Sequence, residues 1–122
     1  MEFFRIVNVK TSETEIQSRI KANAIPEINP EIVLLNENKD VFQIGCIWGE
    51  FTIRRDEIKG GVRFSMLDCP NALSWTITTG YPPDREKVII HLTINRLQKD
   101  QEFVDEINEF IDSWVKGIEN HF

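Results

Sequence analysis

Apolar and polar side chains alternate through most of residues 41–95, and this period of two constrains the fold more than any other feature. Successive side chains of a β-strand point to opposite faces, so the apolar series would share one face. That series is Phe42, Ile44, Cys46, Trp48, Phe51, Ile53, Val62, Phe64, Met66, Leu73, Trp75, Ile77, Val88, Ile90, Leu92 and Ile94. Runs that contain Gly or Pro predict turns between the strands. We therefore expect an antiparallel meander with one dry face.

Residues 100–122 predict a long helix that covers this dry face. Asp100 is the expected N-cap, because its side chain can accept a hydrogen bond from an unpaired backbone N–H. The apolar positions that follow recur at helical spacing and form one wide stripe. They are Phe103, Val104, Ile107, Phe110, Ile111, Trp114, Val115 and Ile118. Burying such side chains contributes ~1.5–3 kcal/mol each, so this helix is expected to be a major source of stability.

The N-terminal part of the chain predicts a strand followed by a helix. Phe3–Val9 is rich in strand-forming residues. Ser12, preceded by Thr11, and Glu15 fit a capping box, which starts a helix that runs to about Ala24.

Pro26 and Pro30 then predict a loop, because proline cannot donate the hydrogen bond that a helix interior needs. Residues 32–35 are expected to form a short buried strand, closed by a turn at residues 36–40. Together these elements predict one α+β domain over residues 1–122. Its sheet would have five to seven largely antiparallel strands, with an N-terminal helix and the long C-terminal helix on one face.

Composition excludes several classes of protein. The chain has 122 residues, of which 41% are hydrophobic and 28% charged, as in an ordinary globular domain. It lacks a signal-like N-terminus and an apolar run of about 20 residues, so we expect no membrane association. Cys46 and Cys69 fit no zinc or disulfide pattern. We expect no metal, no cofactor and a cytoplasmic location.

The formal net charge of −6 is concentrated in the last helix. Residues 100–122 carry seven acidic residues and one basic residue, whereas the remainder is balanced. Five carboxylates on the predicted outer side form a candidate partner-binding site: Glu102, Asp105, Glu106, Glu109 and Asp112. Such a row would attract a basic protein and repel nucleic acid. The alternative is that these acids only complement the helix dipole and keep the protein soluble.

The polar side chains of the strands form a second candidate site on the opposite sheet face. This set is Glu50, Thr52, Arg54, Arg63, Ser65, Ser74, Thr76, Thr78, His91, Thr93 and Asn95. If the sheet curves, Arg54, Arg63, Thr76 and His91 could bind an anionic ligand or serve a minor enzyme activity. The alternative is a solvated face in which threonine is favoured for its strand propensity.

No recognised catalytic motif is present. The chain has neither a GxSxG nor an HExxH sequence, and the only hydroxyl set is Ser74 or Thr76 with His91 and Glu50. That set would need those strands to be neighbours and the three groups to lie within hydrogen-bond reach. We therefore expect a protein that is not an enzyme.

In size, acidity and α+β character the chain is similar to small bacterial immunity proteins and antitoxins, which neutralise basic toxins. This is a likeness of overall properties that no motif carries. It implies a binding protein whose acidic C-terminal helix meets a basic partner, such as a toxin. A homo-oligomer that associates through a sheet edge or the polar face is a third possibility, and the oligomeric state stays open.

Overall fold

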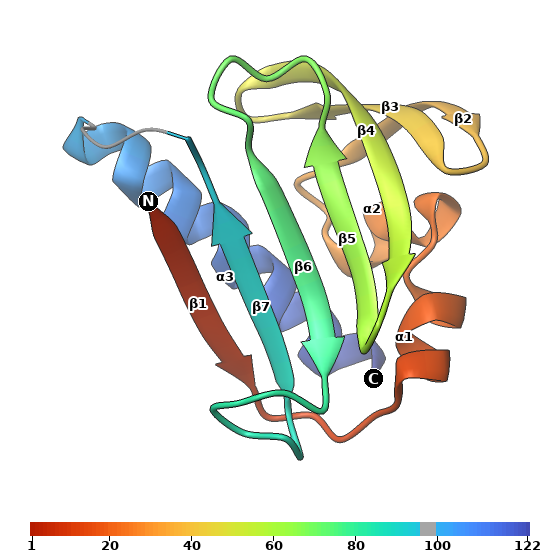
Figure 1. Ribbon diagram of the computed structural model, residues 1–122. Helices are drawn as coiled ribbons and strands as arrows, with labels where there is room; N and C mark the ends of the chain where they lie inside the picture. The colour runs from red at the N-terminus through yellow and green to blue at the C-terminus, as the bar shows by residue number, and fades with distance from the viewer. Residues whose placement is uncertain (96–99) are drawn as a thin grey trace.

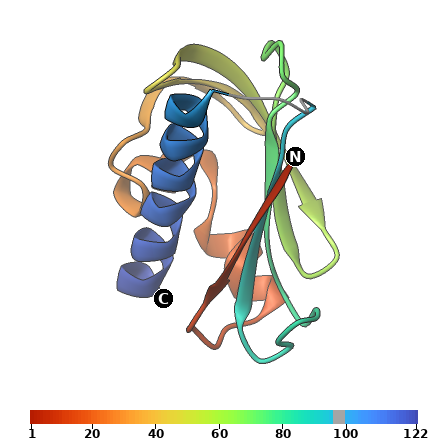
Figure 2. The ribbon, with the colours of Figure 1, turned by 90° about the vertical axis from the view of Figure 1, so that its left-hand side faces the viewer.

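The computed structural model describes residues 1–95 and 100–122 and shows a seven-stranded antiparallel sheet with the described helices on one face (Figure 1, Figure 2). The strands are β1 (Glu2–Val7), β2 (Val33–Asn38), β3 (Val41–Cys46), β4 (Gly49–Ile58), β5 (Gly61–Met66), β6 (Ser74–Thr79) and β7 (Val88–Thr93). The helices are α1 (Glu13–Arg19), the 3-10 helix η1 (Ala22–Ala24), α2 (Ile25–Ile28) and α3 (Gln101–His121). The α+β architecture predicted from the sequence is confirmed.

The strand order is β1-β7-β6-β5-β4-β3-β2, so the strands from β2 to β7 form a meander and the first strand pairs with the last. Residues 8–32 carry the chain from one edge of the sheet to the other. The amino group of Met1 donates a 2.9 Å hydrogen bond to the carbonyl oxygen of Ile94, 93 positions away. The β1 edge of the sheet therefore forms only when distant parts of the chain meet.

The predicted dry face of the sheet is confirmed, because most of the alternating apolar series is buried against the helices. Cys46, Trp48 and Phe51 are the partly buried members of that series. Trp48 lies in the turn between β3 and β4, where Cys46 pairs with Gly49. The period of two therefore holds within the strands and ends where the chain turns.

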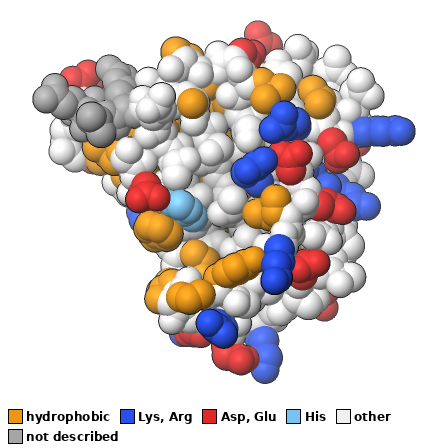
Figure 3. Space-filling view, viewed as in Figure 1, with side chains coloured by type: hydrophobic (Ala, Val, Ile, Leu, Met, Phe, Trp, Pro, Cys, Tyr) orange, Lys and Arg blue, Asp and Glu red, His pale blue; other side chains and the backbone are white. Residues whose placement is uncertain are grey.

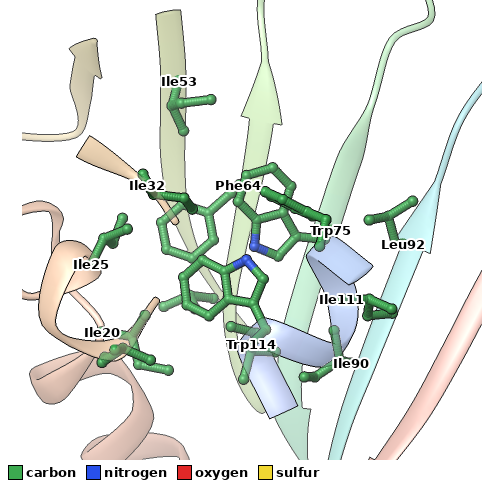
Figure 4. Close-up of a cluster of buried hydrophobic side chains, with 14 of the residues drawn as sticks. Ile20, Ile25, Ile32, Ile53, Phe64, Trp75, Ile90, Leu92, Ile111 and Trp114 are labelled. Carbon is green, nitrogen blue, oxygen red and sulfur yellow. The ribbon is translucent and has the colours of Figure 1, made fainter. Parts of the chain in front are cut away.

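An aromatic cluster joins α3 to the centre of the sheet (Figure 4). The ring of Trp114 lies 5.9 Å from the rings of both Phe64 and Trp75, measured between centroids. Trp75 also meets Phe110 edge to face at 5.2 Å. Aromatic pairs in such geometries contribute ~0.5–1.5 kcal/mol beyond the area they bury. These contacts fix which side of α3 faces the sheet.

The capping of α1 agrees with the sequence, but its length does not. The Ser12 hydroxyl accepts a hydrogen bond from the Glu15 amide at 3.2 Å, and the Glu15 carboxylate accepts one from the Thr11 hydroxyl at 3.0 Å. The helix ends at Arg19, and the chain continues through η1. The expected end near Ala24 was therefore too late.

The predicted loop over residues 26–30 was wrong in part, because α2 occupies Ile25–Ile28 and contains Pro26. Pro26 lies in the first turn, where a backbone N–H would have no helical partner. The short buried strand expected at residues 32–35 is instead the longer edge strand β2, most of which is exposed. β2 is the last strand of the sheet among the described residues, and its Val33 and Leu35 side chains are exposed.

No described helix combines the length and apolar character that crossing a membrane requires. Even α3 carries acidic residues along its outer side.

Gly117 allows α2 and α3 to approach closely. A Cβ atom at this position would overlap the backbone carbonyl of Ile28. Alanine forms helices better than glycine by about 1 kcal/mol, so without this overlap the substitution would stabilise the protein. We expect Gly117→Ala to lower the free energy of unfolding by about 1–3 kcal/mol, because the two helices must separate.

Urea denaturation followed by tryptophan fluorescence would measure this change. Lys116→Ala, at the exposed neighbouring position, is the control and should change the stability by less than about 0.5 kcal/mol. A Gly117→Ala protein as stable as the parent would contradict the predicted close packing.

Arg55 points to the covered face of the sheet and ties α1 to β4. Its side chain is 5% exposed. Nε donates to the carbonyl oxygen of Ile20 at 2.9 Å, and one terminal nitrogen donates to that of Gln17 at 2.7 Å. Both carbonyls lie at the C-terminal end of α1, where a positive charge is favourable. Arg55 thus satisfies backbone groups that the helix leaves unpaired.

We expect Arg55→Met to lower the free energy of unfolding by about 2–4 kcal/mol, because the buried carbonyls lose their donors. Arg54→Met is a matched control, since Arg54 is the adjacent residue and lies on the exposed face. It should cost less than about 1 kcal/mol. Thermal and urea denaturation of the two variants side by side would test the difference, and equal losses would refute it.

Candidate functional site

The outward side of α3 presents a set of exposed carboxylates, as the sequence predicted. Glu102, Asp105 and Glu109 are exposed, and their positions lie opposite the buried stripe of the helix. Asp105 accepts a 2.8 Å hydrogen bond from the Gln101 side chain. Within residues 1–95 and 100–122, no Lys, Arg or His forms an ion pair with any of these three acids.

Asp112, also in the predicted set, is bound by Arg5 of β1. The Arg5 Nε atom lies 2.8 Å from the Asp112 carboxylate, and one terminal nitrogen donates to the side-chain oxygen of Asn108 at 2.7 Å. The other terminal nitrogen donates to the carbonyl oxygen of Phe4 at 2.9 Å. Arg5 therefore attaches α3 to β1 and occupies a backbone acceptor in this edge strand. An edge strand blocked in this way is less available for pairing with a second copy.

Glu106, the fifth acid of the set, is half-buried and faces Trp48. Its carboxylate accepts a 3.3 Å hydrogen bond from the indole nitrogen. The Trp48 ring also lies 5.9 Å from Phe103 and 5.2 Å from Phe110, so the β3–β4 turn packs against the first half of α3. The five predicted residues thus divide into three exposed acids without a cationic partner in the described chain and two, Glu106 and Asp112, that contact Trp48 and Arg5.

Like charges remain close together on this surface. Asp105 and Glu109 are four residues apart on the helix, a spacing that places side chains side by side. Such a pair costs a few tenths of a kcal/mol in an isolated helix, and the buried stripe of α3 outweighs that cost. A cation placed between these carboxylates would remove the repulsion.

Strand pairing brings most of the second predicted set together on the open face of the sheet (Figure 3). His91 pairs with Thr76, and Thr76 pairs with Arg63, so these three residues lie in one row across β7, β6 and β5. Arg63 in turn pairs with Asp56 of β4, and Arg54 lies two positions along the same strand. The sequence therefore predicted the shared face correctly.

The three residues of this open face that could bind an anion through a cationic group, Arg54, Arg63 and His91, already contact carboxylates of the protein. Arg54 and Arg63 both contact the same carboxylate oxygen of Asp56, at 3.2 and 3.3 Å. His91 Nε2 lies 2.9 Å from the Glu2 carboxylate. The His91 ring stacks on Phe4, with 4.1 Å between centroids. A bound anion would have to compete with these internal partners.

The residues proposed as a hydroxyl-based catalytic set do not form a hydrogen-bonded relay. Thr76 is the strand partner of His91, but the imidazole forms its hydrogen bond with the Glu2 carboxylate. The Ser74 hydroxyl is bonded to that of Thr93 at 3.0 Å. Glu50 lies in β4, near its start. A nucleophile, base and orienting acid are therefore not aligned here.

Two hollows in the surface of the described chain lie away from Thr76 and His91. One of about 530 Å³ is bordered by the α1–η1 connection, the β2–β3 turn and β4, and Arg55 forms part of its wall. Its other charged lining residues are Lys21, Glu37, Lys39, Asp40, Asp56 and Glu57. A second hollow of about 380 Å³ lies beside the first half of β2 and has Gly45 in its lining.

Sequence reasoning did not identify the role of Arg55. Its position in β4 could have suggested that role, because Arg55 alternates with Ile53 and pairs with Phe64, both on the dry face. A buried arginine needs acceptors, and those acceptors belong to a helix that begins more than 30 residues earlier. Position in the strand predicts burial, but it does not identify the partners.

Cys46 and Cys69 are free thiols, each partly buried. Burial raises the pKa of the Cys46 thiol, although hydrogen bonds from the backbone of Trp48 and Gly49 act in the opposite direction. A raised pKa reduces the thiolate fraction at neutral pH. Among the described residues, no three His, Cys, Asp or Glu side chains are grouped so as to hold a metal ion.

No protein-family model and no curated protein matches this chain. The function is therefore inferred from the charges and the shape of the protein surface.

Proposed function

We propose that this protein is a non-enzymatic binding module that docks a basic protein against the outward side of α3. The observation that carries the proposal is the exposure of Glu102, Asp105 and Glu109 without a cationic partner in the described chain. Carboxylates arranged in this way raise the association rate of an oppositely charged protein.

The rigidity of α3 supports this proposal. Ile107, Phe110, Ile111, Trp114 and Ile118 are all buried, so the helix is packed before any partner arrives. Arg5 and Trp48 hold it from either side. A partner therefore meets carboxylates on a fixed scaffold, and less conformational entropy is lost on binding than with a mobile segment.

The specific form of binding that we propose is inhibition of a basic toxin, as in immunity proteins and antitoxins. Size, acidity and α+β fold support this choice, together with the acidic outer surface of α3. The free thiols Cys46 and Cys69 are compatible with a reducing compartment such as the cytoplasm. The small-molecule alternative is less favoured, because the guanidinium groups of the open face already share Asp56.

A pull-down at low salt would first recover the basic partner, which mass spectrometry would identify. We expect combined substitution of Glu102 and Glu109 by Gln and of Asp105 by Asn to weaken that complex at least tenfold at low ionic strength. The slope of affinity against salt should also become shallower, because exposed charges are screened within about 10 Å at 0.1 M salt. Calorimetric titration at several salt concentrations would measure both effects.

A matched control removes three exposed carboxylates elsewhere, through Glu27→Gln, Glu37→Gln and Glu86→Gln. This variant has the same net charge as the α3 variant. It should retain more of the affinity, because its changes lie outside the proposed contact surface. Equal losses in the two triple variants would show that only net charge matters, and an unchanged α3 variant would refute docking at α3.

A further inference from the structure

Gly45 is the one glycine in the chain without a backbone requirement for glycine. The other five are explained by positive φ angles at Gly49, Gly60 and Gly80, and by the backbone carbonyls that a Cβ atom would meet at Gly61 and Gly117. A Cβ atom at Gly45 would meet only the Leu35 side chain, at an ordinary 3.9 Å. Glycine weakens a strand interior, so its presence in β3 needs another reason.

The missing side chain of Gly45 leaves a shallow hollow in the open side of the sheet, called here the Gly45 hollow. It has a volume of about 380 Å³ and is lined by Glu31, Val33, Leu35, Gly45, Cys46, Gly49 and Glu50. Gly45 is the strand partner of both Val33 and Glu50, which places it between them. Val33 is 57% exposed and Leu35 47% exposed, so two aliphatic side chains beside the hollow remain in solvent.

Two exposed carboxylates flank this apolar surface. Glu31 precedes β2, and Glu50 follows the β3–β4 turn. Across the described residues, neither forms an ion pair with Lys, Arg or His. The Gly45 hollow therefore combines aliphatic contact area with negative charge, and its complement is an aliphatic side chain next to a basic one.

The β3–β4 turn links this hollow to the acidic side of α3. Gly49 lines the hollow, and the preceding residue, Trp48, donates its indole N–H to Glu106 of the helix. Ile47, which precedes Trp48 in this turn, is 56% exposed. Charged surfaces direct the approach of a partner, whereas buried apolar contacts supply most of the affinity. The outward side of α3 offers the charged surface, and the Gly45 hollow offers the apolar contact.

We propose that the Gly45 hollow receives an aliphatic side chain from an extended segment of the basic partner, with flanking Lys or Arg side chains paired to Glu31 and Glu50. This inference rests on the proposed binding of a basic protein and names the contact that anchors it. The occupant is an extended segment because Val33, Gly45 and Glu50 lie in one row across three strands. Because alternate side chains of an extended chain point to the same side, residues two positions apart in a segment crossing that row can reach the apolar and acidic positions.

The probe for this site is a blocked pentapeptide, Lys-Ser-Val-Ser-Lys, whose valine and two lysines share one side when it is extended. It would be titrated into the protein of residues 1–122. Binding would be followed by amide chemical shifts in heteronuclear NMR spectra. We expect shifts at Val33, Leu35 and Gly45. The control peptides Lys-Ser-Ser-Ser-Lys, which lacks the valine, and Glu-Ser-Val-Ser-Glu, which reverses the charge, should bind at least tenfold more weakly. Gly45→Val should weaken binding of the Lys-Ser-Val-Ser-Lys peptide at least tenfold, because the new side chain would project into the hollow where the peptide's valine would lie.

Melting temperatures and a control substitution separate a loss of peptide binding from unfolding. Gly45→Ala and Gly45→Val should melt at or above the temperature of the parent protein, because a strand favours either residue over glycine. Gln43→Val, two positions along the same face of β3, should leave peptide affinity within twofold of the parent. Undiminished peptide binding by Gly45→Val, or shifts confined to α3, would overturn the inference.

Failure of the inference and failure of the proposed function give different results. If Gly45→Val binds the peptide normally while the α3 triple variant loses the basic partner, docking at α3 stands and the hollow is not its anchor. If Gly45→Val loses the peptide while the α3 triple variant keeps the partner, the hollow is a binding site and docking at α3 is refuted.

Discussion

The packing of Trp114 against Phe64 and Trp75 is the interaction on which the rest of the structure depends. It fixes α3 across the sheet and determines which side of the helix meets solvent. The indole nitrogens of Trp75 and Trp114 are buried with no hydrogen-bond partner in the described chain. Leaving such donors unpaired costs about 1–3 kcal/mol each. The aromatic contacts and buried area must outweigh that cost, so packing dominates the centre of this protein.

Two arginines then attach the helices to the sheet at points that the aromatic cluster does not reach. Arg55 satisfies carbonyl groups at the end of α1, and Arg5 holds Asp112 and Asn108 of α3. Both use the planar guanidinium group, whose several donors can contact separate acceptors at once. The Arg5 contact also determines which acids of α3 can meet a partner. Asp112 is bound to Arg5, whereas Glu109, three residues earlier, is exposed.

The two surfaces of interest have a common physical origin in the coverage of only one sheet face. Because α3 covers the dry face, its carboxylates must point away from the sheet, and the opposite face stays open. Near β2 that open face loses polar character, and a glycine leaves space beside Val33 and Leu35. The turn that contains Trp48 connects this region to α3. A partner that contacted both would gain from charge and from apolar burial.

The sequence by itself determined the features that depend on neighbours a few positions apart. These include the inward alternation around Trp75, the apolar stripe around Trp114 and the cap at Ser12, because strand and helix periods are local. It did not reveal the short helix at Pro26, where a proline in the first turn looks the same as a proline in a loop. Only the tertiary structure decided that Arg55 caps α1 and that Arg5 forms an ion pair with Asp112, 107 positions away. Such pairings depend on which segments the strand order brings together, and the spacing of residues along the sequence does not determine that order.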